Sequence, residues 1–312
     1  MASVELTSYT APLLSDLNHS DPPKQSICLK IWLVTGITLC LAVCKALYKL
    51  NILYSNASTF DSVFITCFFS FLASCIFTLC KKLEPIEIAK PLRCHLYLQA
   101  LFSSVGIILI ALAIQLTSFS AAVSYLLLIP VWRALFSSNS KPFLFLLSLL
   151  FLALVLNLVV INPSWFGLQS TFSLSNLLGV CAGYLSSFFL GLALFFHSAQ
   201  LSPFIALIYS HLLTFLLVPY LYIIQNLVST PSFPHFSWLY YLLSLLQGVS
   251  IFLAFLLFHY LSAPTSPQIF LLFLLEIPVA VLLEFLIFEG EWTSVVVAVG
   301  VSILVGAFRL KK

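Results

Sequence analysis

Long apolar runs separated by short polar segments make up most of this chain. A helix needs about 20 consecutive apolar residues to cross a bilayer, and ten runs come close to that length. They are residues 28–50, 61–80, 94–116, 120–137, 143–162, 175–198, 203–226, 238–261, 266–288 and 293–309. The pattern predicts ten transmembrane helices, and therefore an all-α polytopic membrane protein.

Composition supports this prediction and excludes a soluble domain. Of the 312 residues, 62% are hydrophobic and only 7% are charged, with 30 Phe against 10 Gly. The formal net charge of +3 is too small and too dispersed to indicate a nucleic-acid partner. The partner that composition indicates is the lipid bilayer, and the oligomeric state, including a homodimer, stays open.

The positions of Lys and Arg predict the orientation, because these residues concentrate in cytosolic loops. The loops near 51–60, 117–119, 163–174, 227–237 and 289–292 contain none of them. Basic residues instead flank the other ends of the runs: Lys24, Lys30, Lys81, Lys82, Lys90, Arg93, Lys141, Arg309, Lys311 and Lys312. Both termini are therefore expected in the cytosol.

Residues 1–26 are polar and lack the apolar core of a signal peptide, so they are expected to form a disordered cytosolic tail. The rest divides into three parts. Residues 27–142 hold spans one to four of the first repeat, residues 143–174 hold its fifth span and a connecting loop, and residues 175–309 hold the five spans of the second repeat. Residues 310–312 form a cytosolic end.

The two repeats are inferred from a match at an offset of 148 residues. At this offset Thr117-Ser118 coincides with Thr265-Ser266, and Pro130-Val131 coincides with Pro278-Val279. Five spans per repeat is an odd number, so the second copy would enter the membrane in the opposite orientation. Two inverted five-helix repeats are the plan of alternating-access carriers.

Ionisable residues inside apolar runs are the first candidates for a functional site, since a charge at mid-membrane costs about 2.5–3.5 kcal/mol even on lenient scales. Glu276 and Glu284 are eight residues apart, which places them about 12 Å apart along a helix and within about 80° of each other. Glu276 is a candidate ligand for a proton or a substrate, or the partner of a structural salt bridge to Lys45. Glu284 is a second candidate nearer the membrane surface.

Basic and aromatic candidates complete the list. Lys45 and Lys49 share a helix face; Lys45, one turn deeper, is a candidate to point into the cavity, and Lys49, at the end of its span, is expected to extend to water. Arg133 is suited to bidentate phosphate binding, or it extends to water. Tyr209 and His211, on either side of Ser210, suit a base or sugar, or hydrogen bonds between helices.

Motifs of soluble enzymes are missing from the sequence, so an enzyme is not expected. The eight cysteines, at 28, 40, 44, 67, 75, 80, 94 and 181, lack C-x-x-C spacing and matching His partners. They predict neither zinc nor a disulfide framework, and packing is their simplest role. Neither a cofactor nor a metal is expected.

The segment PVAVLLEFLIFEGEWT, followed by VVVAVGVSILVGAF, resembles the last hairpin of the drug/metabolite transporter superfamily. Pro278, Gly290, Glu291, Gly300 and Gly306 match that pattern. Pro130 occupies the position in the first repeat that corresponds to Pro278. The resemblance extends more weakly over about residues 31–309 and implies ten helices in two inverted repeats.

Within this superfamily, the chain is most similar to the nucleotide-sugar and triose-phosphate exchangers. ALYKLNILYS resembles their first hairpin, with Lys49 at the Lys position and Tyr48 where Asn is usual. IYSHLLTFLLVPY resembles the FYNN motif, with Ser210 and His211 in place of the two Asn. LFLLEIPVAV resembles the GALNK motif, with Glu276 in place of Lys.

The resemblance implies a secondary transporter that exchanges a nucleotide sugar for a nucleoside monophosphate, in the Golgi or another endomembrane, or at the plasma membrane. Glu276 in place of Lys leaves a second hypothesis open: proton-linked or facilitative export of an amino acid or other small metabolite. A third is a receptor or chaperone that keeps the fold and does not transport.

Overall fold

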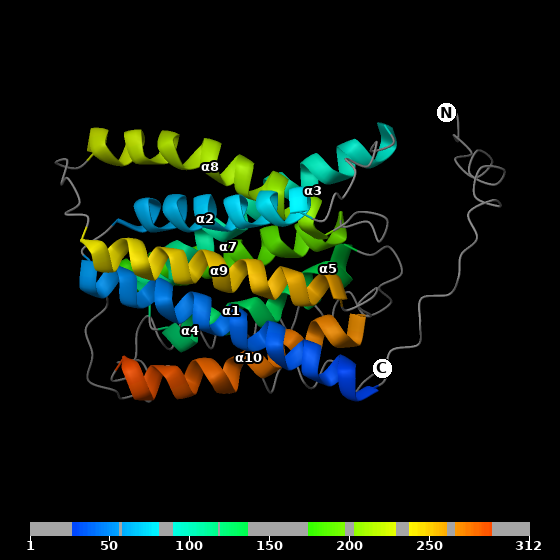
Figure 1. Cartoon of the computed structure of the whole chain (residues 1–312). Helices are drawn as coiled ribbons and strands as arrows, with labels where there is room; N and C mark the ends of the chain where they lie inside the picture. The colour runs from blue at the N-terminus through cyan, green and yellow to red at the C-terminus, as the bar shows by residue number, and fades with distance from the viewer. Residues whose placement is uncertain are drawn as a thin grey trace, which may run out of the picture.

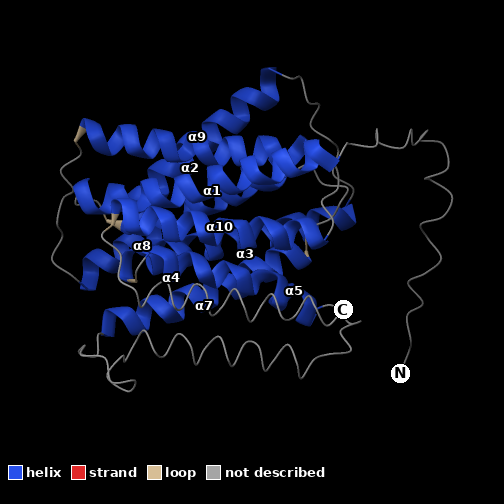
Figure 2. Ribbon diagram, turned by 90° about the horizontal axis from the view of Figure 1, so that it is seen from below, coloured by secondary structure: helices blue, strands red, loops and turns tan. Residues whose placement is uncertain are grey.

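The described part of the chain is built from helices of one bundle. The computed structural model describes residues 27–55, 58–80, 90–117, 119–136, 174–196, 203–228, 237–260 and 266–288. Their helices are α1 (Ile27–Ser55), α2 (Thr59–Cys80), α3 (Lys90–Leu116), α4 (Phe119–Ser124), the 3₁₀ helix η1 (Tyr125–Leu128), α5 (Ile129–Phe136), α7 (Leu174–Phe195), α8 (Pro203–Val228), α9 (Trp238–Tyr260) and α10 (Ser266–Ile287). The long helices lie alongside one another (Figures 1 and 2).

Six of these helices are long and apolar enough to cross a membrane: α1, α2, α3, α7, α8 and α9. The chain is therefore a multi-pass integral membrane protein, as its composition predicts. The expected runs 143–162 and 293–309 lie outside the described residues, as do the tail 1–26 and the end 310–312. The number of ten spans therefore stays a prediction.

The two faces of α2 show how the sequence places the helices. Side chains exposed on the bundle surface are large and apolar at three- or four-residue spacing: Phe68, Leu72, Ile76 and Leu79. Side chains buried toward the other helices are small and hydroxylated at four-residue spacing: Ser62, Thr66, Ser70 and Ser74. Lipid accepts the first set, and small residues allow close helix packing in membranes.

Close packing is most pronounced along α7. A Cβ atom added to Gly183 would lie 2.1 Å from Cδ2 of Tyr125, and one added to Gly191 would lie 2.6 Å from Cβ of Trp132. The absence of side chains at these two positions therefore lets η1 and α5 approach the backbone of α7. The indole of Trp132 on α5 also donates a hydrogen bond of 3.1 Å to Ser187 Oγ on α7.

The expected fourth span, 120–137, differs from the prediction of a single helix. It consists of α4, η1 and α5 in succession. Pro130 explains the change. It has no N–H to donate the helical hydrogen bond to Leu126 O, and its ring lies too close to that carbonyl. The helix tightens to 3₁₀ geometry just before it. Pro219 and Pro278, in contrast, lie inside α8 and α10 without ending them.

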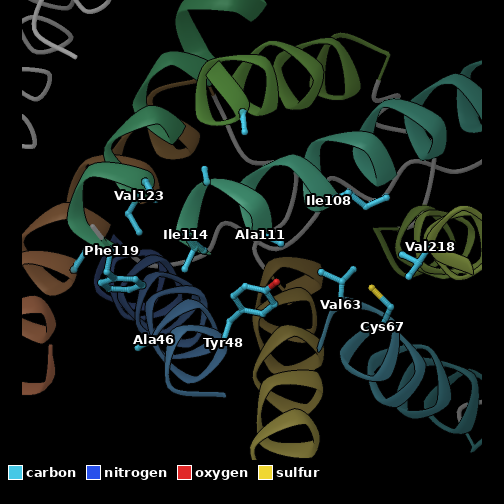
Figure 3. Close-up of a cluster of buried hydrophobic side chains, with 14 residues drawn as sticks. Ala46, Tyr48, Val63, Cys67, Ile108, Ala111, Ile114, Phe119, Val123 and Val218 are labelled. Carbon is cyan, nitrogen blue, oxygen red and sulfur yellow. The ribbon is translucent and has the colours of Figure 1, made fainter. Parts of the chain in front are cut away.

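A buried apolar cluster connects both halves of the chain. Its side chains come from α1, α2, α3, α4, α7, α8 and α10, and Figure 3 labels Tyr48, Val63, Ile108, Phe119 and Val218 among them. The Tyr48 hydroxyl donates a hydrogen bond of 3.1 Å to Thr59 O at the start of α2. Because Ala46 and Tyr48 are packed in this core, the rotation of α1 about its axis is fixed. That rotation sets the direction of the neighbouring Lys45 and Lys49.

Candidate functional site

Lys45 and Glu276 form an ion pair in the interior of the bundle. Lys45 Nζ donates a hydrogen bond to Glu276 Oε1, between α1 and α10. The Glu276 side chain is 1% exposed and that of Lys45 is 15% exposed. The two helices lie side by side and run in the same direction (Figure 1). The salt bridge that the sequence offered as one role for Glu276 is thus formed.

Lys49, one turn further along α1, also turns inward. Its ammonium donates hydrogen bonds of 2.7 Å to Ile114 O and 3.0 Å to Thr117 O. These carbonyls belong to the end of α3, where the last carbonyls have no partner within their own helix. Lys49 therefore caps α3, contrary to the expectation that it extends to water.

Glu284 places a second carboxylate near this lysine. Its side chain is 4% exposed, and it lies close enough for its charge to act on Lys49. Two lysines on α1 therefore face two glutamates on α10. The formal charges of these four residues cancel.

The seventh expected span has its motif buried against α3. Ser104 Oγ donates a hydrogen bond of 2.7 Å to Ser210 O, and Ser210 Oγ donates one of 2.7 Å to Ala206 O in its own helix. Tyr209 makes an edge-to-face contact with Tyr97, with ring centroids 5.9 Å apart. The bond between the helices therefore uses the backbone carbonyl of Ser210, and the Ser210 hydroxyl is bound within α8.

His211 is buried without a hydrogen-bond partner among the described residues. Its side chain is 1% exposed, and both Nδ1 and Nε2 lack a donor or acceptor. Buried polar atoms in folded proteins are almost always hydrogen-bonded, to protein or to ordered water. The His211 nitrogens therefore require partners beyond the described residues, either ordered water or another molecule.

Polar pairs between α9 and the first two helices were not predicted from the sequence. Asn51 Nδ2 donates a hydrogen bond of 2.9 Å to Ser244 Oγ. Thr66 Oγ1 donates one to Gln247 Oε1. The only signal available beforehand was the four-residue spacing of hydroxyl residues in α2, which indicates a polar face inside an apolar run.

The structure does not bring every predicted residue together. Arg133 is partly buried in the last turn of α5 and has no ion-pair partner among the described residues. Pro278 is exposed on α10, and Pro130 is partly exposed on α5. Gly290, Glu291, Gly300 and Gly306 lie outside the described residues.

Comparisons with known proteins give the fold alone. No family model matches the chain, and no curated protein matches it. A solved structure described only as "Crystal structure of protein" aligns over 88% of this chain and 97% of its own, with a TM-score of 0.54 and 15% sequence identity. That likeness supports a shared arrangement of helices and carries nothing about activity.

Proposed function

We propose that this protein is a secondary carrier that moves a small polar metabolite across a membrane by alternating access. The observation that carries the proposal is the symmetry of the helix contacts between the two halves of the described chain: each contact has a counterpart in which the halves change roles. In the proposed duplication, α1, α2, α3 and the α4–η1–α5 segment correspond to α7, α8, α9 and α10.

Every principal contact between the halves then has a counterpart. Helix α1 packs on α9 as α7 packs on α3, and α2 packs on α9 as α8 packs on α3. Helix α1 also packs on α10, as α7 packs on η1 and α5. The two remaining contacts, α2 with α8 and α4 with α10, join an element to its own counterpart.

This pattern is expected of a pseudo-twofold axis that passes between α2 and α8 and between α4 and α10. Five spans per repeat would make the two copies inverted, as in carriers whose binding sites lie at the repeat interface near mid-membrane. The Lys45–Glu276 pair joins helices of the two halves, and buried ionisable residues are functional candidates by default in a membrane.

The resemblance to the drug/metabolite transporter superfamily supports exchange of a nucleotide sugar for a nucleoside monophosphate, or of a related organophosphate. A Golgi or other endomembrane location and cytosolic termini belong to the same proposal. One observation favours the second candidate, export of an unphosphorylated metabolite. Lys45 and Lys49 are occupied by Glu276 and by backbone carbonyls, so neither presents a free charge to phosphate.

Counterflow into liposomes tests transport directly. Purified protein is reconstituted, the liposomes are loaded with one unlabelled solute, and uptake of the same labelled solute is followed. The panel comprises nucleotide sugars, nucleoside monophosphates, sugar phosphates and amino acids. A carrier gives transient accumulation that saturates and that protein-free liposomes lack. Folded protein that accumulates no solute would favour the receptor or chaperone alternative.

A further inference from the structure

Several buried polar atoms on the neighbouring helices α2, α8 and α9 have no hydrogen-bond partner among the described residues. They include Ser70 Oγ on α2, Nδ1 and Nε2 of His211 on α8, and Gln247 Nε2 on α9. In the apolar interior of a membrane protein, an unsatisfied polar group costs several kcal/mol. Unpartnered polar atoms that lie close together on these helices therefore indicate that another molecule binds between them.

The register of α2 and α8 places His211 opposite Ser70. The two helices run in opposite directions (Figure 1), and the rings of Phe64 and Phe215 stack with centroids 4.2 Å apart. The side chains of Cys67 and Thr214 also interact across the same interface. One turn further along α2 comes Ser70, and one turn back along α8 comes His211, so both face this interface at the same depth.

Helix α9 reaches the same depth. Thr66 donates its hydroxyl to Gln247 Oε1, which leaves the Gln247 amide nitrogen without a partner among the described residues. A Cβ atom added to Gly248 would lie 3.0 Å from Ser70 N, so the backbones of α2 and α9 are close at this point. The unpartnered atoms of Ser70, His211 and Gln247 therefore belong to one region.

The chemistry of these atoms selects the ligand. A serine hydroxyl both donates and accepts hydrogen bonds, and an amide nitrogen donates them. A neutral imidazole donates a hydrogen bond from one nitrogen and accepts one at the other. The sequences of α2, α8 and α9 contain a single Asp, Glu, Lys or Arg residue, Asp61 in the first turn of α2, more than two turns from Ser70. The region therefore offers hydrogen bonds in both directions and no free charge, which matches hydroxyl groups better than a phosphate, a carboxylate or an ammonium group.

We propose that Ser70, His211 and Gln247 form a binding site for an uncharged, hydroxyl-rich group. Two sources share this chemistry: a free polyol or monosaccharide, and the sugar of a nucleotide sugar. The binding site is argued from the side chains alone. The statement that its ligand is a transported substrate rests on the carrier function proposed above. It names the part of the substrate that the α2–α8–α9 region holds.

Two serines of α2 provide a matched pair for the test. Ser70 and Ser74 are both fully buried, but Ser74 Oγ donates a hydrogen bond of 2.8 Å to Ser70 O, whereas Ser70 Oγ has no partner among the described residues. Ser70→Ala therefore removes no side-chain hydrogen bond among the described residues and is expected to fold. Ser74→Ala controls for loss of a buried hydroxyl one turn away.

Binding is measured with the full-length protein in detergent, by thermal shift against myo-inositol, D-glucose, UDP-glucose and L-alanine. At least one hydroxylated probe is expected to stabilise the wild type and Ser74→Ala with similar dissociation constants. Ser70→Ala should bind it about 3- to 10-fold more weakly, the range of one neutral hydrogen bond. His211→Leu should weaken binding of the same probe further.

The probes separate the two sources and the two proposals. Binding of myo-inositol or D-glucose identifies a free solute, and binding of UDP-glucose alone identifies the sugar of a nucleotide sugar. Equal effects of Ser70→Ala and Ser74→Ala, binding of L-alanine alone, or no binding by folded protein would each overturn the site. A probe that binds at Ser70 but gives no counterflow would keep the site and overturn the carrier function.

Discussion

At the residue scale, the Lys45–Glu276 pair predicts a strong coupling between two substitutions. Removing one member leaves a buried charge without its partner, which typically costs about 3–5 kcal/mol. Lys45→Met and Glu276→Gln should each lower the free energy of unfolding by about that amount. The double variant should lose much less, because replacing a whole buried pair is often close to neutral. Unfolding by SDS titration in mixed micelles measures all three.

Lys30→Met, near the beginning of α1, is the control for that cycle, because Lys30 has no ion-pair partner among the described residues. It should change the free energy of unfolding by about 0.5 kcal/mol or less, as surface substitutions usually do. If the effects of Lys45→Met and Glu276→Gln simply add in the double variant, the pair does not exist in the protein.

Sequence reasoning singled out polar residues inside apolar runs more readily than it predicted the contacts of those residues. Glu276, Lys45 and His211 stand out because polar side chains are costly in apolar runs. The partners of Lys49 and Gln247 could not be predicted, since they depend on how each helix is rotated about its axis. Helices that are apolar nearly all round carry little periodic signal for that rotation.

At the element scale, the approach of η1 to α7 predicts unequal effects of two glycine substitutions. Gly183→Ala would place a Cβ atom 2.1 Å from the buried ring of Tyr125, which has no space to move. Overpacking of this kind costs about 1–3 kcal/mol. Gly36→Ala meets only the end of the Leu257 side chain, at 3.0 Å. The thermal unfolding midpoint should fall for the first variant and stay within a few degrees for the second.

Equal midpoints for these two variants would show that η1 does not pack on α7 as the structure has it.

Most helix positions were predictable here, since the runs 28–50, 61–80 and 238–261 agree with α1, α2 and α9 to within a few residues. The division of the fourth run was not predicted, although Pro130 was visible. Proline also occurs inside α8 and α10 without ending them, so the sequence alone does not decide its effect.

At the scale of the whole molecule, an inverted duplication predicts that corresponding helices begin on opposite sides of the membrane. Helices α1 and α7 correspond in the proposed repeats, and each starts with an exposed side chain, Cys28 in α1 and Leu174 in α7. In sealed vesicles of known orientation, a membrane-impermeant maleimide should label Cys28 from the cytosolic face only. In a variant whose native cysteines are replaced, the thiol introduced by Leu174→Cys should be labelled from the other face only. Labelling of both positions from the same face would rule out the inverted repeat, and with it the symmetry from which alternating access is proposed here, because the corresponding helices of an inverted pair must begin on opposite sides of the membrane.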